Sequence, residues 1–426
     1  MIDGLAMQDT VCTSRYALSG HGANAIGNRA CLCHTNSEKK ELPHYDIAVI
    51  GAGIAGASVA ARLALQGQRV VLLEMENQPG YHTTGRSAAV FAPGYGPAPI
   101  RSLTRASEDF FLNPPDGFTG TALFSPRPIM MLARSDQRTA LESLQAELDK
   151  DDGAGNNVSL VDAQALRDAN PLVRHGYAEA ALIDKAGQDI DVAALHQGFL
   201  ALYRYAGGKV ICGAKVEALY AGSQGWTIET KSAGDPLSLS AQLVVNAAGA
   251  WADQLGVMAG AESIGLVPKR RTAAMIEAPA QSGLSGCPIT IDIDEQFYLK
   301  PDTGRLLISP ADETRVEAYD AQPEELDLAI CVDRIETAFD LQVKKIEHKW
   351  AGLRSFVADK SPVAGYSAKV RGFYWLAGQG GYGIQSSPAL SEFAAAQILG
   401  KRLPGYIVDK GLEPGDLAPS RLANSS

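Results

Sequence analysis

The chain has 426 residues, of which 46% are hydrophobic and 20% charged; this is ordinary for a globular protein and excludes a disordered or fibrous chain. At roughly 150 residues per domain, the length predicts two or three domains. There are 38 lysine and arginine residues against 48 aspartate and glutamate residues, so the net charge is −10. An acidic chain of this kind is a poor candidate for nucleic-acid binding.

The N-terminal segment, residues 1–43, is polar and has neither helical nor strand periodicity. It lacks the continuous apolar core of a secretory signal, so we expect a loosely ordered extension without a catalytic role; an unusual targeting sequence is the alternative. The most apolar stretch, residues 47–67, is interrupted by glycines and Arg62, and we expect no transmembrane segment. The cysteines have neither disulfide nor metal-ligand spacing, which favours a cytoplasmic location, free or peripheral to the inner face of a membrane, and no metal site.

A βαβ unit follows this segment. Residues 45–50 are predicted to form a buried strand, a helix then ends near residue 67, and residues 68–74 form a second buried strand. The order strand, helix, strand predicts a parallel pair with a crossover helix.

Glycines fill the turn between the first strand and the helix. Gly51 allows a tight turn, Gly53 lets the backbone approach a pyrophosphate, and Gly56 lets the helix pack closely on the sheet. Glu74 ends the second strand, where it can accept hydrogen bonds from ribose hydroxyls. The motif predicts a dinucleotide site, but it leaves NAD and FAD open.

The middle of the chain mixes helices with short strands. Residues 191–207 are predicted to form an amphipathic helix that Asp191 caps and Gly207 ends. Strands dominate from about residue 263 to 345, with one helix near residues 325–337. The strands with clear limits cover residues 209–220, 225–230, 237–239, 243–249, 273–276 and 297–300.

A glycine-rich loop precedes the last helix. Four glycines fall within residues 378–383, and such a loop forms a backbone nest that accepts anions. The helix is expected to run to Leu399, with Ser386 or Ser387 as cap and Pro388 in its first turn. Its N-terminus would stabilise negative charge on a reduced flavin ring. From residue 404 onward the chain is expected to run over the surface as an irregular tail.

These motifs together resemble the D-amino-acid oxidase and glycine oxidase type of FAD-dependent amine oxidoreductases, and within it most of all bacterial D-arginine dehydrogenases. The resemblance covers residues 45–421 and favours FAD over NAD. Residues 244–251 are similar to the second strand motif of flavoproteins. The other segments that carry the resemblance are residues 80–89, 125–128, 268–271, 297–301, 350–356 and 379–383.

The resemblance implies an α/β fold in which a Rossmann-type FAD-binding domain is interrupted by a sheet-rich, α+β substrate domain. The FAD-binding domain would comprise residues 44–122, 186–262 and 347–403. The substrate domain would comprise residues 123–185 and 263–346, and residues 404–426 would form the tail.

The resemblance also implies roles for single residues. Arg354 and Arg271 would grip the substrate carboxylate, which suits a guanidinium because it donates two parallel hydrogen bonds. Tyr298 would contact the same carboxylate, Tyr95 would belong to a mobile lid, and the Gly381 carbonyl would receive the substrate amine. The structural alternatives are an ion pair for the arginines, a core position for Tyr298 and a surface loop position for Tyr95.

The expected FAD contacts follow the motifs. No cysteine occurs in residues 378–385, so we expect FAD to be held without a covalent link. His82 and His196 are expected to pack or to contact the flavin rather than to catalyse. The residues expected to bind FAD are Gly51, Gly53, Ile54, Ala55, Gly56, Glu74, Arg86, Ser87, Ala88, Ala89, Val216, Ala248, Gly249, Trp251, Gly380, Gly381, Tyr382, Gly383, Ile384 and Gln385.

Three positions depart from the D-arginine dehydrogenase pattern. Ile129 replaces a glutamate that would hold the guanidinium of arginine, and Val90 and Ala92 replace a histidine and a threonine near the flavin. A buried guanidinium without a carboxylate partner costs several kcal/mol. We therefore expect a side-chain pocket that favours apolar or uncharged substrates over D-Arg.

The predicted function is FAD-dependent oxidative deamination of D-amino acids to imino acids and then 2-oxo acids. The alternatives are an oxidase of secondary amines or N-methyl and imino acids, and a flavin-bearing subunit without turnover. The expected partners are a small amino-acid substrate and an electron acceptor, which could be a quinone, a dye-like carrier or oxygen. The pattern excludes none of these acceptors.

Overall fold

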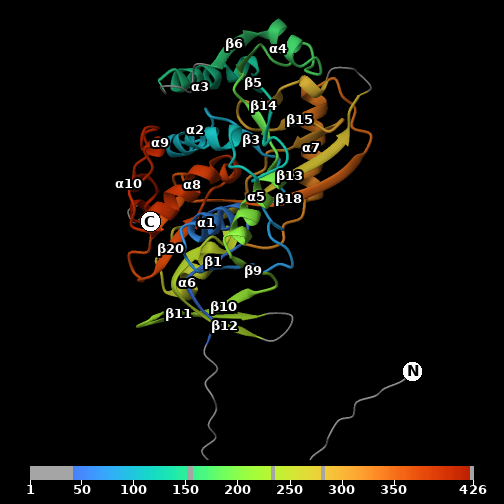
Figure 1. Cartoon of the computed structure of the whole chain (residues 1–426). Helices are drawn as coiled ribbons and strands as arrows, with labels where there is room; N and C mark the ends of the chain where they lie inside the picture. The colour runs from blue at the N-terminus through green and yellow to red at the C-terminus, as the bar shows by residue number, and fades with distance from the viewer. Residues whose placement is uncertain (1–41, 151–156, 232–235, 280–283, 423–426) are drawn as a thin grey trace, which may run out of the picture. The chain divides into compact units, whose positions relative to one another are not determined.

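The computed structural model describes residues 42–150, 157–231, 236–279 and 284–422 (Figure 1). The predicted N-terminal extension therefore lies almost entirely outside the described residues. From residue 42 onward the strands form an eight-stranded, a nine-stranded and a three-stranded sheet. The two larger sheets position the candidate site.

The eight-stranded sheet contains the predicted βαβ unit. Its parallel part has the order β9-β2-β1-β12-β20. The second half of β1 and all of β2 are buried apolar runs, as expected where both faces of a parallel sheet are covered. These strands are β1 (His44–Ile50), β2 (Val70–Leu73), β9 (Lys209–Ile211), β12 (Leu237–Asn246) and β20 (Phe373–Ala377).

Helices cover one face of this parallel part. The helix α1 (Ile54–Leu65) packs against α5 (Val192–Tyr205) and α8 (Gly383–Ile398), and their apolar side chains form one core with the sheet. A second core on the opposite face includes α6 (Ala252–Ala259) and the hairpin of β10 and β11. As predicted, the side chain of Asp191 caps α5 by accepting a hydrogen bond from the Ala194 N–H.

β12 is one strand, whereas the sequence predicted two segments. Its first half pairs antiparallel with β11, and its second half pairs parallel with β1 and β20. Because the partner changes along the strand, its burial pattern changes too, which explains the apparent break. The neighbouring strands are β10 (Lys215–Gly222), β11 (Gly225–Lys231) and β19 (Val363–Tyr366), which pairs with β20.

The nine-stranded sheet has the order β17-β13-β16-β15-β14-β5-β7-β6, with β18 also paired to β13. One face forms a core with α7 (Glu325–Ala338), and the other face borders the candidate site. The strands are β5 (Ile129–Ala133), β6 (Val158–Asp162), β7 (Ala180–Asp184), β13 (Val267–Glu277), β14 (Ile289–Asp292), β15 (Tyr298–Asp302), β16 (Arg305–Ser309), β17 (Thr314–Arg315) and β18 (Ile346–Phe356).

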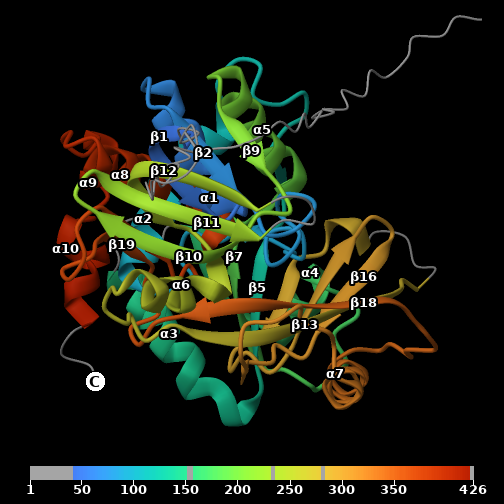
Figure 2. The ribbon, with the colours of Figure 1, turned by 90° about the horizontal axis from the view of Figure 1, so that it is seen from below.

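β13 and β18 run side by side as two long antiparallel strands (Figure 2). β18 therefore belongs to the nine-stranded sheet, although the expected domain limit at residue 347 assigns nearly all of it to the FAD-binding domain. The division into domains stays a prediction. The fold class, α/β with a Rossmann-type part and a second sheet, is confirmed.

The start of α8 differs from the prediction. The helix begins at Gly383, so Ser386 and Ser387 lie inside it and cap nothing. Their hydroxyls donate to the carbonyl oxygens of Tyr382 and Ile384, at 2.9 and 3.0 Å. Pro388 has no N–H that could donate to the Ile384 carbonyl oxygen, and the Ser387 hydroxyl donates to that oxygen instead. This substitution lets the helix pass through a proline.

The C-terminal tail is also more ordered than expected. It contains α9 (Gly405–Val408) and α10 (Pro414–Leu417), and Ile407, Leu412 and Leu417 are buried in the core around α1. These apolar residues are spaced between the glycines and prolines that suggested an irregular tail. The expectation of a tail confined to the surface is wrong.

The three-stranded sheet, in the order β3-β8-β4, and the helix α2 lie on the connections between the two large sheets, whereas α3 and α4 connect strands of the nine-stranded sheet. The elements are β3 (Val90–Phe91), β4 (Phe124–Pro126), β8 (Gln188–Ile190), α2 (Ala98–Leu112), α3 (Arg138–Lys150) and α4 (Ala163–Ala169).

Candidate active site

A cavity of about 630 Å³ lies at the carboxyl ends of β1 and β2, where Ile50 and Leu73 form part of its wall. We call it the cofactor cavity. Ligands of open α/β sheets bind at such strand ends. Among the residues expected to bind FAD, those in its wall are Gly51, Gly53, Ile54, Ala55, Glu74, Arg86, Ser87, Ala88, Val216, Ala248, Gly249, Trp251, Gly380, Gly381, Gly383 and Ile384.

The glycine turn has no room for side chains. Gly51 has φ +101°, and a Cβ atom there would lie 2.4 Å from the Ala247 carbonyl oxygen. A Cβ atom on Gly56 would lie 1.8 Å from the Gly51 carbonyl oxygen. Gly56 therefore does not line the cavity. It lies behind the wall, where the lack of a side chain lets α1 pack closely against the glycine turn. The turn leaves backbone exposed to the cavity, as a pyrophosphate site requires.

Glu74 lies in the cavity wall with its carboxylate already bonded to the backbone. Oε2 accepts from the Ala52 N–H at 2.8 Å and Oε1 from the Glu76 N–H at 3.0 Å. Burial raises the pKa of Glu74, and these two hydrogen bonds oppose the rise. Each oxygen keeps a second lone pair, so the carboxylate can still accept a hydrogen bond from a ribose hydroxyl.

Three polar residues of this region have structural partners. The Arg86 guanidinium donates to the carbonyl oxygens of Ala321 and Ala351 and pairs with Asp320. The ring of His196 contacts the Ala52 carbonyl oxygen at 2.9 Å, and burial lowers its pKa. The His82 ring packs on Trp251, with ring centroids 4.6 Å apart. These contacts hold the cavity wall in place.

A second cavity, of about 150 Å³, adjoins the first. We call it the side-chain cavity. Both cavities have Ser87, Ala88, Arg271, Tyr298, Arg354 and Gly381 in their walls. The predicted residues Ala89, Val90, Ala92, Tyr95, Ile129, Tyr382 and Gln385 line only the side-chain cavity. The predicted carboxylate grip therefore lies where the two cavities meet.

The pairing of β13 with β18 brings the two arginines together. Arg271 faces Gly352 and Arg354 faces Lys269, so the arginines are diagonal neighbours on one face. Arg271 donates to the Asp312 carbonyl oxygen at 3.0 Å and reaches Glu313 at 3.4 Å. Burial, and then the charge of Arg354, lower the pKa of Arg271.

Arg354 has no hydrogen bond or ion pair with any other residue that the structure describes. A Cβ atom on Gly381 would lie 2.9 Å from its Nη1 atom, so the guanidinium lies against the glycine loop. A partly buried guanidinium beside a second cation is costly unless an anion joins it. The arrangement is suited to a carboxylate, which can bond to both arginines.

Three tyrosines surround the arginines. Tyr298 begins β15 and is 9% exposed. The Tyr95 hydroxyl donates to Oε1 of Glu295, and its ring lies 5.4 Å from that of Tyr382. Burial raises the pKa of Tyr95 well above its usual value and that of Tyr382 to about 12. Both stay protonated at neutral pH and can donate a hydrogen bond.

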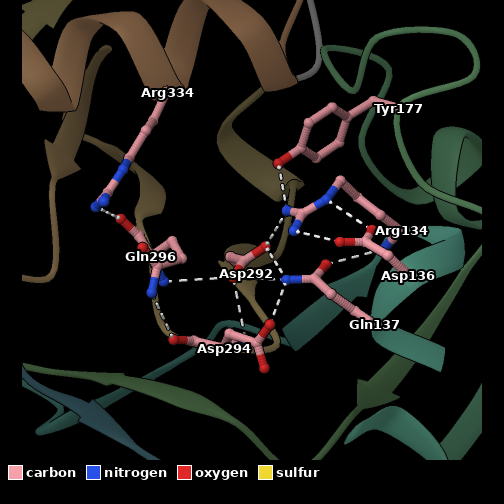
Figure 3. Close-up of polar contacts among 8 residues, drawn as sticks. All are labelled: Arg134, Asp136, Gln137, Tyr177, Asp292, Asp294, Gln296 and Arg334. Atoms are coloured by element: carbon pink, nitrogen blue, oxygen red, sulfur yellow. Dashed lines mark hydrogen bonds and ion pairs between the residues drawn. The ribbon is translucent and has the colours of Figure 1, made fainter. Parts of the chain in front are cut away.

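A polar network surrounds Asp292 and Asp294 (Figure 3). The turn that begins at Asp292 also contains Glu295, whose N–H donates to the Asp292 carbonyl oxygen. Asp292 is fully buried, and its carboxylate accepts from Gln137 at 3.0 Å, from Arg134 at 3.2 Å and from the Asp294 N–H at 3.0 Å. Glu295 itself has φ +55°. Because Gln137 and Arg134 follow β5, the network ties this turn to the strand that carries Ile129.

Two carboxylates that the sequence analysis did not assign to the pocket line the side-chain cavity. Glu295 and Asp184 both line the side-chain cavity, in addition to the predicted Ile129. Sequence reasoning considered only position 129. The sequence did contain a signal for Asp184. Residues 182 and 184 of a strand point to the same face of the sheet, and Asp184 is the one polar residue of a strand that otherwise consists of apolar residues.

The sheet, the glycine turn and the cofactor cavity together define a dinucleotide-binding fold. Residues 46–397 match the family model described as FAD dependent oxidoreductase, and the chain belongs to this family. FAD is therefore its cofactor, as predicted. The absence of room for side chains at Gly51 and Gly56 and the acceptor oxygens of Glu74 fit a dinucleotide of this kind.

Several known proteins are similar to this chain over most of its length. The hydrogen cyanide synthase subunit HcnC of Pseudomonas aeruginosa is 26% identical over 384 residues, which are 80% of this chain and 89% of that protein. Human mitochondrial dimethylglycine dehydrogenase is 24% identical over 88% of this chain but only 45% of its own length. Glycine oxidase of Geobacillus kaustophilus is 24% identical over 89% of this chain and 96% of that protein.

Solved structures show the same fold. The crystal structure of glycine oxidase from Geobacillus kaustophilus has a TM-score of 0.73 at 21% identity and covers 84% of this chain and 96% of that one. L-proline dehydrogenase from P. horikoshii has a TM-score of 0.74 and covers 87% and 99%. The likeness to glycine oxidase is thus confirmed, while the special likeness to D-arginine dehydrogenase stays a prediction. Within the described residues, every helix is too short or too polar to cross a bilayer.

Proposed function

We propose that the protein oxidises the α-amine of D-amino acids and yields imino acids that hydrolyse to 2-oxo acids. One observation carries the proposal: the Arg354 guanidinium, without a partner among the described residues, lies beside Arg271 where the two cavities meet. An amino acid held there by its carboxylate places its α-carbon between the cofactor cavity and the side-chain cavity. This geometry is what an α-amine oxidation needs.

In this proposal, Arg354 and Arg271 hold the carboxylate, and the hydroxyl of Tyr298 adds a third donor. The backbone carbonyl of Gly381 accepts a hydrogen bond from the amine. FAD supplies, when bound, a two-electron acceptor for the α-hydrogen. No side chain has to remove a proton if the amine enters neutral, which agrees with the structural partners of His82 and His196.

Tyr95 completes the enclosure in this mechanism. Its loop is flanked by Gly94 and by Gly96, which has φ +95°, so the backbone can change conformation there. Release of the Tyr95 hydroxyl from Glu295 would open the side-chain cavity. Closure would exclude water while the amine is oxidised. The lid role is part of the proposal.

The apolar wall favours substrates whose side chains have an apolar body. Ile129, Val90 and Ala92 contribute to it, and burial of each methylene there stabilises the complex by about 0.8 kcal/mol. We propose that apolar and uncharged side chains are accepted for this reason. Their expected advantage over D-Arg assumed that no carboxylate is present, and Asp184 changes that assumption.

A second candidate is oxidation of secondary amines or of N-methyl and imino acids. It is favoured by the similarity to proteins named glycine oxidase and dimethylglycine dehydrogenase, and by the fold of an iminodiacetate oxidase with a TM-score of 0.72. The same carboxylate grip would serve these substrates. They differ in having little or no side chain to fill the side-chain cavity.

The deciding experiment mixes the holoenzyme anaerobically with D-amino acids, L-amino acids and N-methyl amines and follows the loss of the visible absorbance of the oxidised flavin. We expect D-amino acids to reduce the flavin fastest. Faster reduction by sarcosine-type amines would favour the second candidate. No reduction by any amine would favour a flavin-bearing subunit without turnover.

The electron acceptor and the location are part of the proposal. A quinone, a dye-like carrier or oxygen would each reoxidise the flavin after amine oxidation. The spacing of the cysteines favours the cytoplasm, free or at the inner face of a membrane. Reoxidation of the reduced holoenzyme by each acceptor in turn, followed in a stopped-flow spectrometer, distinguishes the three.

A further inference from the structure

One face of the nine-stranded sheet forms the far wall of the side-chain cavity. The neighbouring strands β14, β5, β7 and β6 contribute to it. Side chains directly opposite each other on paired strands point to the same face. The cavity-lining residues of this face are Ile289, Ile291, Ile129, Met131, Leu182, Val158 and Asp184.

Asp184 is the one polar side chain among these seven. It ends β7 and lies opposite Ile129 on one side and Val158 on the other. Leu144 and Leu148 of α3 line the same cavity. A carboxylate surrounded by aliphatic groups loses hydration and gains nothing from packing, so a polar partner is needed to offset the cost.

Among the described residues, one group supplies such a partner. Oδ1 accepts a hydrogen bond from the Ala186 N–H at 2.8 Å, and Oδ2 has no partner among the described residues. Burial raises the pKa of Asp184, and the bond from Ala186 opposes the rise; no described cation contributes. Asp184 lines the same cavity as Arg271 and Arg354, and four strands of the sheet separate its strand β7 from β13, which carries Arg271.

We infer that Asp184 is a specificity-determining residue that binds a hydrogen-bond donor, preferably a cationic one, at the end of the substrate's side chain. The inference rests on the proposed function, because it takes the arginine end of the cavity as the site of the substrate carboxylate. A substrate side chain with an apolar body and an amino or guanidinium end would then contact the apolar residues of the wall along its length and Asp184 at its end. The inference also reverses the expectation that Ile129 excludes basic substrates.

The second carboxylate of the cavity does not compete for this role. Glu295 accepts the hydrogen bond of Tyr95 and lies near Arg271, where its negative charge opposes the lowering of the Arg271 pKa by burial and by Arg354. It is therefore satisfied by groups at the carboxylate-binding end. Asp184 has no comparable partner among the residues that the structure describes, which leaves its second oxygen to the ligand.

The test uses two carboxylic acids that the enzyme cannot oxidise at an α-amine. 6-Aminohexanoate is lysine without its α-amine, and hexanoate is the same chain without the terminal amine. Each is titrated into the FAD-loaded protein, and binding is followed by the change in the flavin spectrum. We expect 6-aminohexanoate to bind at least about tenfold more tightly in the wild type, which corresponds to about 1.4 kcal/mol.

Two variants assign the effect. Asp184→Asn removes the charge but keeps an oxygen for the Ala186 N–H, and it should bring the affinity ratio close to one. Glu295→Gln is the matched control in the same cavity. It should still bind 6-aminohexanoate at least about fivefold more tightly than hexanoate, where tenfold would correspond to about 1.4 kcal/mol. Flavin content and thermal unfolding check that both variants fold.

The outcomes are separable. Equal binding of the two acids by the wild type overturns the inference without any variant, and so does loss of the ratio in Glu295→Gln but not in Asp184→Asn. If 6-aminohexanoate binds more tightly but no D-amino acid reduces the flavin, the proposed function fails and the inference stands. If D-norleucine reduces the flavin while the two acids bind equally, the proposed function stands and the inference about Asp184 fails.

Discussion

At the scale of single residues, Arg354 is the side chain on which the proposed reaction depends most. Its guanidinium lies against Gly381 and has no partner among the described residues. A substrate carboxylate would therefore supply its counter-charge. Replacing Arg354 with alanine should therefore lower kcat/KM for D-amino acids by on the order of 3–5 kcal/mol in transition-state stabilisation, because a buried carboxylate would lose its charged partner.

The measurement compares Arg354→Ala with the wild type in steady-state kinetics and in flavin content. Flavin content should stay normal, because the residue faces the substrate position. Arg138→Ala, an arginine exposed on α3, is the control for losing one positive charge. Near-normal turnover by Arg354→Ala would mean that the residue is structural.

Ile129 allows a second test at this scale. Ile129→Glu should raise kcat/KM for D-Arg at least about tenfold, or about 1.4 kcal/mol, and lower it for D-Leu. Because Asp184 lies opposite, the two carboxyl groups would repel, and one would hold a proton. The gain should therefore be clearest in the double variant Ile129→Glu with Asp184→Asn.

The kinetic assay uses D-Arg and D-Leu with the wild type, the single variants and the double variant. A double variant that is no better than Asp184→Asn alone with D-Arg would contradict the placement of residue 129. The ratio of D-Arg to D-Leu is the quantity to compare, since it cancels changes in active enzyme.

Residue roles were predictable only where a motif carries them. Gly51, Gly53 and Glu74 follow from chemistry and spacing, and the structure brings them to one cavity. Arg271 and Arg354 were assigned through resemblance, and only the pairing of β13 with β18 makes them neighbours. Asp184 and Glu295 reach the same cavity through strand register and one left-handed turn residue, which no local pattern specifies.

At the scale of elements, the glycine turn and α1 form the most constrained contact. A Cβ atom on Gly56 would lie 1.8 Å from the backbone oxygen of Gly51, which cannot move without opening the turn. Gly56→Ala should therefore lose most of the bound FAD and lower the unfolding temperature. The expected cost is that of overpacking, about 1–3 kcal/mol.

Gly120→Ala is the matched control, because a Cβ atom there has no neighbour within 4 Å. The ratio of flavin to protein absorbance, measured after purification and again after dialysis, reports FAD retention. Normal retention in Gly56→Ala would show that the turn tolerates displacement.

The C-terminal tail is fastened to the rest of the chain by an ion pair. Arg421 Nε lies 2.8 Å from Asp359 Oδ2, and Arg421 also donates to the Ser361 carbonyl oxygen. Burial alone would raise the pKa of Asp359, but the hydrogen bonds from Arg421 and the Ser361 N–H lower it below its usual value.

A lowered pKa in the folded state means that this contact stabilises the protein above pH 3.8 and is lost as the pH falls through the lower, folded value. Asp359→Asn should thus unfold at a lower temperature than the wild type at pH 7, by a small margin because the carboxylate is 44% exposed. The two should converge below about pH 3.8. A margin that does not change with pH would exclude the ion pair as its cause.

Elements were predictable where periodicity is local. The βαβ unit and α5 with its Asp191 cap agree with the sequence prediction. The start of α8 was not predictable. Serine is a common N-cap residue, but the glycine loop turns at Gly380, which has φ +55°, and the helix therefore begins at Gly383, before either serine. The tail was missed because three separated apolar residues give no period.

At the scale of the whole molecule, FAD retention depends on non-covalent contacts in our prediction. The loop before α8 has no cysteine, and the cofactor cavity is enclosed by residues from distant parts of the chain. Acid precipitation of the purified protein should therefore release the yellow cofactor into the supernatant. Chromatography should identify it as FAD. Colour that remains in the pellet would indicate a covalent link.

The order of the strands along the chain has a consequence for synthesis on the ribosome. β1 emerges first, but its partner β12 and the next strand β20 come from the middle and the end of the chain. The strands of the other large sheet lie between them in sequence. A growing chain therefore carries open strand edges and an uncovered α1 until β20 and α8 have left the exit tunnel.

This interleaving means that no N-terminal fragment that ends before β20 contains the finished eight-stranded sheet. A nascent chain stopped before residue 363 lacks β19, β20 and α8, so apolar residues such as Val244 and Leu63 stay in water. Such surfaces are the ones that molecular chaperones bind and that aggregate when they are left free. The eight-stranded sheet is thus completed only after β20 and α8 have left the exit tunnel, and the yield of native protein depends on what protects the unfinished sheet until then.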